Sequence, residues 1–287
     1  MKKLLVWLLA LLLLCSAGLA EPLPQWAHTF QGKVVHAYDS ETLKYTVERF
    51  SYEQVRCYVT KLWMAQPGRQ IRKATGVWEE SLAMPADMAQ QVEGAVLAVN
   101  GSGYVSPTFP EIPDNYPGSS PDYFYTPLGS LTITDGKVFR NLAGVPFYGL
   151  TLQADGLHLH VGEDNEEILQ NAPTQTWSFY EGCPMIVEHE SILDETWSFA
   201  KAHAIRTIIA KMDDNNYILL TVTSEERYGL SLIQCVDLLQ EYFDPVWAYD
   251  LDGGPSSALM CRQNAAAKWK MVFGGKRQDA DVMAFTE

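Results

Sequence analysis

The chain has 287 residues, of which 47% are hydrophobic, and a formal net charge of −14. This length is enough for one large domain or two small ones with an apolar core. The acidic balance argues against non-specific binding to nucleic acid or to an anionic membrane, because both need a basic patch that displaces counterions. We therefore expect no nucleic acid partner, and an anionic substrate would need a local cluster of arginine or lysine.

The first twenty residues have the layout of a secretory signal peptide. Two lysines follow Met1, an apolar run covers residues 4–14, and small residues continue to Ala20. The run is too short to span a bilayer comfortably, so we expect cleavage and no stable membrane span afterwards. A lipoprotein anchor at Cys15 is the alternative, which the bulky Leu14 before it disfavours. Removal of residues 1–20 leaves 19 basic and 35 acidic residues, a net charge of −16.

Export places the mature protein in a secreted or extracytoplasmic location, at the cell envelope. An even number of cysteines remains there, which allows three disulfide pairings, and the absence of a CxxC pair disfavours a structural zinc site. Buried free thiols are the alternative. The four residues are Cys57, Cys183, Cys235 and Cys261.

Residues that alternate between apolar and polar predict antiparallel strands along most of the chain. Asp-Gly pairs at 135–136 and 155–156 and a polar turn at 213–216 separate several of them, as in hairpins. Helical patterns occur at 84–96 and 230–243. In the second, apolar residues share one face and Ser231 is a candidate N-cap. The predicted strand segments are 43–52, 54–64, 130–141, 148–162, 183–190 and 215–224, and the apolar helix positions are Leu232, Val236, Leu239 and Phe243.

These elements predict an α+β fold, a single domain with a mixed, largely antiparallel β-sheet core and packed helices. One long stretch, residues 101–129, has no periodicity and is rich in proline, glycine and tyrosine. Such a long loop is usually functional or disordered. We interpret it as a substrate-binding flap, with a packed structural loop as the alternative.

The segment "AYDLDGGPSSALM", residues 248–260, is the strongest candidate for a site. Asp250 and Asp252 are two residues apart at the end of a predicted strand, so their side chains point to the same face. The glycines that follow permit a sharp turn and close approach of a ligand, and a helix start there would offer free N–H groups to an anion. A capped strand-turn-helix corner is the alternative. The candidate groups after the acids are Gly253, Gly254, Pro255, Ser256 and Ser257.

Other patterns in the sequence are weaker. His158 and His160 share a strand face and could bind a metal with Glu163, although exposed strand histidines are commoner. A serine nucleophile in the 248–260 segment lacks the GxSxG elbow. No cofactor is certain. A divalent cation, calcium or magnesium, would relieve the crowding of the two aspartates.

Six segments, taken in order, resemble the phosphodiester glycosidase family. The 248–260 segment is similar to its "LDGGGSS" signature, and "GAVLAVNGSGY" to its "AINGGYF" stretch. "WSFYEGCPMIVEHE" is similar to "FGPxLVxDG", and "AIRTIIAKMDDNNYILLTV" to "RTAIGxxxDGxxxLLVV". The helix pattern before the signature and the closing "GGKRQDADVMAFTE" also match. The resemblance covers most of the chain from about residue 44.

The resemblance implies removal of a sugar from a phosphodiester, or cleavage of a related glycosidic bond. It makes Arg206 the candidate for holding the phosphate, with a structural ion pair to one of the aspartates as the alternative. It makes Asp252 the catalytic acid or base, and it gives Asn100 and Gly101 the task of orienting the sugar or phosphate. Substrate-binding candidates are Gly101, Asp250, Gly253, Gly254, Ser256, Ser257 and Arg227.

The sequence departs from the family pattern around the expected pocket. Pro255 replaces the third glycine of the signature and removes an N–H donor. Asp250 stands where the family often has asparagine, and "TSEER" replaces "DGR", so that Arg227 alone keeps the arginine. We therefore consider two functions. The first is an exported hydrolase acting on a phosphodiester-linked glycoconjugate, and the second is a non-catalytic protein that binds a glycan or sugar phosphate.

The predicted organisation is a signal peptide at 1–20, an N-terminal extension at 21–43 and a phosphodiester glycosidase-like domain at 44–287. The partner expected from the resemblance is a carbohydrate or sugar-phosphate substrate. The sequence leaves the oligomeric state open.

Overall fold

The structure, a computed structural model, describes residues 30–107, 118–224 and 228–287. The predicted signal peptide and part of the predicted flap lie outside the described residues, and so does Arg227. Within the described ranges, no helix is both long enough and apolar enough to cross a membrane.

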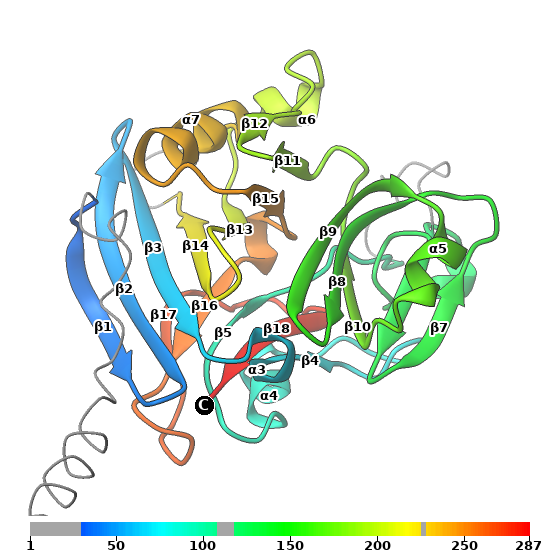
Figure 1. Cartoon of the computed structure of the whole chain (residues 1–287), viewed down its shortest axis with the longest axis horizontal. Helices are drawn as coiled ribbons and strands as arrows, with labels where there is room; N and C mark the ends of the chain where they lie inside the picture. Colours follow the sequence, from blue (N-terminus) through cyan, green and yellow to red (C-terminus); the bar gives the residue numbers. More distant parts are fainter. Residues whose placement is uncertain (1–29, 108–117, 225–227) are drawn as a thin grey trace, which may run out of the picture.

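The largest sheet has eight strands, and each neighbouring pair is antiparallel (Figure 1). Its first strand lies inside the predicted N-terminal extension. Asp-rich turn residues 213–216 join β13 to β14, as the sequence predicts, and Asp213 accepts hydrogen bonds there from two main-chain N–H groups. In sheet order the strands are β1 (Lys33–Asp39), β2 (Leu43–Tyr52), β3 (Val55–Met64), β14 (Asn216–Val222), β13 (Arg206–Lys211), β15 (Trp247–Asp250), β11 (Pro184–Val187) and β12 (Glu190–Ser191).

A second antiparallel sheet has five strands, and the main core lies between it and the eight-stranded sheet. Val99 of β5 and Met283 of β18 pack in this core with Ile209, Leu219 and Tyr249 of the larger sheet. In order, the strands are β17 (Lys270–Gly274), β16 (Ala258–Cys261), β5 (Ala95–Asn100), β18 (Asp281–Thr286) and β4 (Ile71–Thr75).

A smaller β unit is formed by two hairpins and one further strand, shown in green in Figure 1. Both hairpins turn at the predicted Asp-Gly pairs, and Asp135 adopts a positive φ of 50° there. The strands are β6 (Leu131–Thr134), β7 (Lys137–Asn141), β8 (Phe147–Gln153), β9 (Gly156–Glu163) and β10 (Gln175–Ser178).

The longest described helix, α7 (Leu232–Tyr242), covers the other face of the eight-stranded sheet. Ser231 caps it in a capping box with Gln234, and its predicted apolar face is buried. Because strand residues alternate, Ile208 of β13 packs under α7 while its neighbour Ile209 faces the main core. The other helices are α3 (Pro67–Gln70), α4 (Pro85–Gln90), α5 (Asn165–Gln170), α6 (Ser198–Lys201) and the 3₁₀ turns η1 (Pro121–Tyr123) and η2 (Gly254–Ser256).

The architecture confirms the predicted α+β class with a largely antiparallel core. The helix predicted at 84–96 is shorter than expected, because the chain enters β5 at Ala95. All four described cysteines are free and buried. The structure therefore shows the buried free thiols that were the alternative to disulfides.

The described parts of the predicted flap pack as a structural loop. Arg140 of β7 donates hydrogen bonds to the carbonyls of Pro127 and Gly129, and its guanidinium lies 4.1 Å from the centre of the Tyr123 ring. Residues 108–117 of the predicted flap lie outside the described residues.

Candidate active site

The 248–260 segment crosses from one sheet to the other, and this crossing builds the site. β15 ends at Asp250 in the eight-stranded sheet and β16 begins at Ala258 in the five-stranded sheet. Asn100, at the end of β5, holds the crossing from both sides: its amide donates to the Asp252 carbonyl (2.6 Å) and accepts from the Ala258 N–H (3.0 Å). The Asp252 N–H donates to the Gly101 carbonyl (3.0 Å). Asn100 and Gly101 therefore fix the main chain that carries Asp252.

The turn after Asp252 does not offer the predicted free N–H groups. Gly253 donates to the Asp252 carboxylate (2.8 Å) and Gly254 to the Ile205 carbonyl (2.9 Å). The helix start is a three-residue 3₁₀ turn. The N–H groups of Ser256 and Ser257 donate to the carbonyls of Gly253 and Gly254 within this turn. Gly254 has a φ of +57°, which favours glycine. The prediction that this helix start offers free N–H groups to an anion is wrong, because the N–H groups of residues 253, 254, 256 and 257 already donate to protein oxygens.

Arg206 and Asp250 form a buried ion pair. The Arg206 Nη1 lies 3.3 Å from Asp250 Oδ2, and their side chains are 2% and 0% exposed. The other amino group of Arg206 donates to the carbonyls of Phe199 (3.0 Å) and Ala202 (2.9 Å), and the guanidinium lies 4.4 Å from the Phe199 ring centre. Burial raises the pKa of Asp250 to about 7, although Arg206 opposes the shift. Arg206 therefore forms the structural ion pair with an aspartate that was the alternative to its predicted role in holding a phosphate.

Asp252 faces a different cation, Arg277, which follows β17. Asp252 Oδ2 lies 3.5 Å from Arg277 Nη2, and both side chains keep some exposure, 11% and 26%. Burial raises the pKa of Asp252 to about 6; the Ser256 hydroxyl and Arg277 oppose the shift. Asp279 also lies near Arg277, with its Oδ1 3.9 Å from Nε, and burial together with the charge of Asp252 raises the pKa of Asp279 well above the ordinary range. The site therefore holds carboxyl groups that exchange protons near neutral pH.

A cavity of about 600 Å³ opens beside this cluster. Arg277 and Lys276 lie in its wall and supply the local positive charge that an anionic ligand needs in this acidic protein. These two residues are not among the predicted site residues, and the adjacent lysine and arginine in "GGKRQDAD" are the pattern that could have indicated them. The remaining wall residues are Ile205, Ser224, Gly254, Pro255, Ser257, Met271, Val272, Phe273 and Gly274.

The structure brings most of the predicted site residues together. Asn100, Gly101, Asp252 and the 253–257 turn form one connected region, and Arg206 adjoins it through Asp250. Arg227 lies outside the described residues. The histidine pair belongs elsewhere: His160 bonds to Thr151 (2.8 Å) and Glu163 (2.6 Å) in the small β unit. Among the residues that the structure describes, no group of three or more His, Cys, Asp or Glu side chains is arranged to hold a metal ion.

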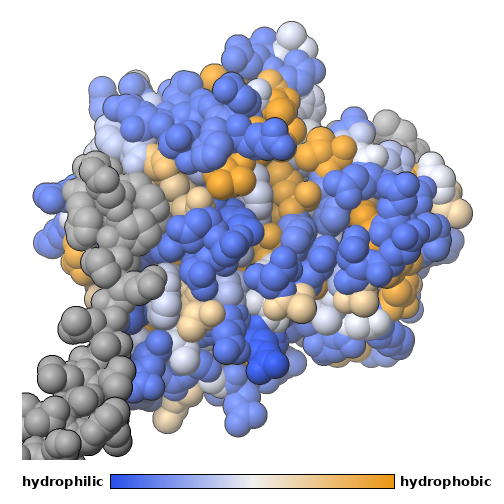
Figure 2. Space-filling model, in the orientation of Figure 1, coloured by the Kyte–Doolittle hydropathy of each residue, from blue (hydrophilic) through white to orange (hydrophobic). Residues whose placement is uncertain are grey.

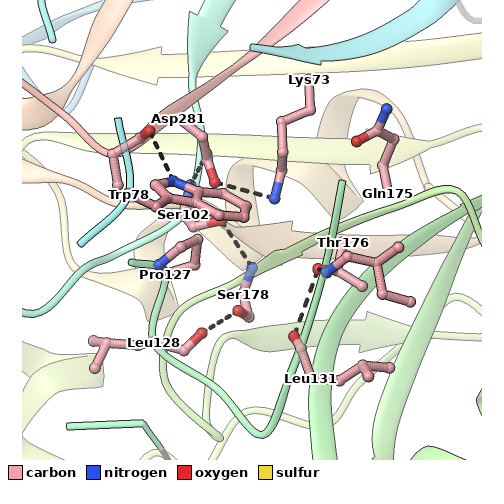
Figure 3. Close-up of polar contacts among 12 residues, drawn as sticks. Lys73, Trp78, Ser102, Pro127, Leu128, Leu131, Gln175, Thr176, Ser178 and Asp281 are labelled. Carbon is pink, nitrogen blue, oxygen red and sulfur yellow. Dashed lines mark hydrogen bonds and ion pairs between the residues drawn. The ribbon is translucent and has the colours of Figure 1, made fainter. Parts of the chain in front are cut away.

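Behind the site lies a second buried ion pair (Figure 3). Lys73 of β4 points to Asp281 of β18, with its Nζ 3.2 Å from Oδ2, and both side chains are fully buried. The ammonium lies 5.3 Å from the ring centres of Trp78 and Trp177. The other oxygen of Asp281 accepts the Ser102 N–H at 2.7 Å. This pair therefore supports the chain next to Gly101.

Comparisons with known proteins bear on the fold and the family of this chain. A search of the curated proteins found no match. The fold is similar to the zebrafish N-acetylglucosamine-1-phosphodiester α-N-acetylglucosaminidase catalytic domain auto-inhibited by its pro-peptide, with a TM-score of 0.63, 16% identity, and coverage of 90% of this chain and 87% of that one. A hypothetical protein from Synechocystis gives a TM-score of 0.54 and 13% identity, covering 86% of this chain and 63% of that one. The sequence profile of the phosphodiester glycosidases matches residues 93–286, so the chain belongs to the phosphodiester glycosidase family.

Proposed function

We propose that this protein is an exported hydrolase that cleaves a sugar from a phosphodiester-linked glycoconjugate. The observation that carries the proposal is the pairing of Asp252 with Arg277 beside a cavity that also contains Lys276. Hydrolysis of a glycosyl phosphodiester needs a carboxyl group at the anomeric centre and cations at the phosphate. Family membership supports the same class of reaction.

In the proposed reaction, the Asp252 carboxylate accepts a proton from a water molecule that attacks the anomeric carbon. The bond from that carbon to the phosphate oxygen breaks, and its electron pair leaves with the phosphate group. Arg277 and Lys276 stabilise the negative charge that develops on the departing phosphomonoester. A pKa of about 6 keeps Asp252 mostly ionised at neutral pH and able to act as a base.

The other predicted site residues take supporting roles in this proposal. Arg206 acts through Asp250, because its guanidinium is engaged with that carboxylate and with two carbonyls. Asn100 and Gly101 position the main chain of Asp252. The substrate-contacting candidates on the turn are Gly253, Gly254, Ser256 and Ser257, of which Gly254 and Ser257 line the cavity. Arg227 stays a predicted substrate-binding residue.

The test is product detection by mass spectrometry with purified residues 21–287. The substrates are N-acetylglucosamine-1-phosphodiesters and an envelope-glycan extract, each with and without calcium. The variants are Asp252→Asn, which keeps the size of the side chain, and Arg277→Met with Lys276→Met. The matched control is Arg69→Met, because Arg69 lies in a different cavity beside Ala154 and Asp155.

We expect the wild type and the Arg69→Met control to release free sugar and Asp252→Asn to release none. Loss of the two cations should lower turnover by at least about a hundredfold, the usual scale for removing charge stabilisation of a leaving group. An Asp252→Asn protein with wild-type turnover would refute the assignment. Saturable binding of a sugar phosphate without product, in a folded wild type, would instead establish the glycan-binding alternative.

A further inference from the structure

The cavity of the candidate active site has an apolar side and a cationic side. We call three consecutive side chains of β17, Met271, Val272 and Phe273, the β17 wall; all three line the cavity and each is partly exposed. Lys276 and Arg277, which follow β17, line the same cavity. Hydrophilic surface predominates on the face of the molecule shown in Figure 2, whereas this cavity presents apolar side chains and cations together.

A β-bulge aims two neighbouring side chains of β17 to the same side. β17 lies at the edge of the five-stranded sheet, next to β16. Phe273 pairs with Leu259 and Met271 with Met260, so Val272 is an extra residue between the two pairs. Regular alternation would put Val272 and Phe273 on opposite faces, yet both pack against the main core. The bulge therefore widens the apolar edge of this core where it meets the cavity.

Two glycines shape the space next to the β17 wall. A Cβ atom on Gly275 would lie 2.3 Å from the Met271 Cε, so this glycine lets the Met271 side chain lie against the main chain. A Cβ on Gly254, which lines the cavity, would meet no atom of the described residues within 4 Å beyond its neighbours in the chain. The cavity of about 600 Å³ therefore stays open at the turn, and its size is usual for a small-molecule site.

The cavity offers few partners to a group that is rich in hydroxyls. Among the wall residues that the structure describes, the neutral polar side chains are those of Ser224 and Ser257. Ser257 is buried, and its Oγ already accepts a hydrogen bond from the Thr207 hydroxyl (3.0 Å). A sugar placed against the β17 wall would lose hydrogen bonds to water without regaining them, whereas a hydrocarbon group gains free energy by leaving water.

The charged groups give the ligand its orientation. Asp252 lies 3.5 Å from Arg277 and is the group proposed to act at the anomeric carbon. The phosphate then belongs at Arg277 and Lys276, and the β17 wall lines the same cavity as these two cations. The part of the substrate beyond the phosphate, which is the alcohol that leaves with it, therefore meets the β17 wall.

We propose that the β17 wall binds the alcohol portion of the substrate and that this portion is a hydrocarbon group, not a second sugar. The substrate class is then a sugar phosphodiester of an apolar alcohol, and the phosphate product is an alkyl phosphate. The identity of the bond that is cut rests on the proposed function. Binding of an apolar phosphate ester does not, so it is tested separately.

The experiment measures binding of methyl phosphate, hexyl phosphate and glucose 6-phosphate to purified residues 21–287 by titration calorimetry. These esters carry no glycosyl phosphate bond, so hydrolysis does not affect the result. Val272→Thr keeps the shape of the side chain and replaces a methyl group with a hydroxyl. Val138→Thr is the matched control, because it makes the same change on β7 in the small β unit, where Val138 is 42% exposed. Lys276→Met removes a cation from the cavity, and thermal unfolding confirms that each variant is folded.

We expect the wild type to bind hexyl phosphate at least about tenfold more tightly than methyl phosphate, because the added methylene groups leave water. Glucose 6-phosphate should bind no more tightly than methyl phosphate. Val272→Thr should weaken hexyl phosphate about threefold and leave methyl phosphate unchanged, and Val138→Thr should change neither. Lys276→Met should weaken both esters by the same factor, because they share the phosphate.

Met271→Gln, which keeps the length of the side chain, provides a second test if Val272→Thr does not fold. Equal binding of hexyl and methyl phosphate, tighter binding of glucose 6-phosphate, or no binding of any of the three probes would overturn the proposal. Sugar-phosphodiester hydrolysis without a preference for hexyl phosphate would leave the proposed function standing and remove this inference. A preference for hexyl phosphate without hydrolysis of any diester would keep the apolar subsite and refute the proposed reaction.

Discussion

Replacing Arg206 with methionine should destabilise the protein in a pH-dependent way. The substitution leaves Asp250 buried without its ion-pair partner and leaves the carbonyls of Phe199 and Ala202 without a donor. The two lost hydrogen bonds cost about 2 kcal/mol in all after relaxation. A buried carboxyl without its partner keeps its proton to higher pH, which costs about 1.4 kcal/mol for each pH unit above the wild-type pKa. At pH 8 we therefore expect a loss of about 3 kcal/mol, or roughly 9 °C in Tm.

The sign of the pH dependence follows from the pKa of Asp250. Its folded-state pKa of about 7 lies above the ordinary value of 3.8, so stability falls as pH rises through this window, because the unfolded state has lost this proton while the folded state keeps it. Arg206 lowers this pKa, and its removal raises it further, so the extra loss of stability accumulates above about pH 7. At pH 5.5 Asp250 is protonated in both proteins, and only the lost hydrogen bonds remain, about 2 kcal/mol.

The assay is urea unfolding of wild type and Arg206→Met at pH 5.5 and pH 8, followed by circular dichroism. The double variant Arg206→Met with Asp250→Asn is the control, because it removes the buried charge as well as its partner. It should recover most of the loss at pH 8. Equal destabilisation at the two pH values, or no recovery in the double variant, would refute the reasoning.

Three further predictions follow from the site. The turnover attributed to Asp252 should fall as pH drops below its pKa of about 6, and a rate that stays constant down to pH 4.5 would contradict its role as a base. Gly101→Ala should unfold at least about 5 °C below wild type, because the new Cβ would lie 1.8 Å from Asp281 Oδ1; an unchanged Tm would rule out this crowding. Lys73→Met should speed hydrogen exchange at the Ser102 N–H, because Lys73 pairs with the Asp281 carboxylate that accepts this N–H. The control Lys61→Met breaks a different buried pair, with Glu48, and should leave this exchange unchanged. Equal exchange in both variants would show that Lys73 does not hold the main chain at Ser102.

Much of the fold follows from local pattern. The strand at 43–52 has the bounds of β2, and the hairpins turn at their Asp-Gly pairs, because alternation and turn chemistry act over a few residues. Ser231 and the apolar face of α7 are predicted for the same reason. The helix at 84–96 fails beyond residue 90, since pairing of β5 with β16 and β18 outweighs helical propensity there.

The roles of the two arginines depend on tertiary packing. The family resemblance selects Arg206, yet its surroundings at Asp250 and α6 are buried, and both of its amino groups bond to protein acceptors there. Arg277 is about 70 residues further along the chain, and only the closure of β17 and β18 around the turn brings it to Asp252. Sequence patterns do not encode which of two arginines keeps solvent exposure.

The sequence by itself determined the antiparallel α+β class, the location of the aspartate-glycine turn and the family. The tertiary structure decided what that turn can do. It showed that the N–H groups of the turn already donate hydrogen bonds to protein acceptors and that Lys276 and Arg277 line the adjoining cavity. The physical reason is that secondary structure depends on interactions between near neighbours in the chain. Burial, charge pairing and pKa depend instead on residues that meet only when the two sheets pack together.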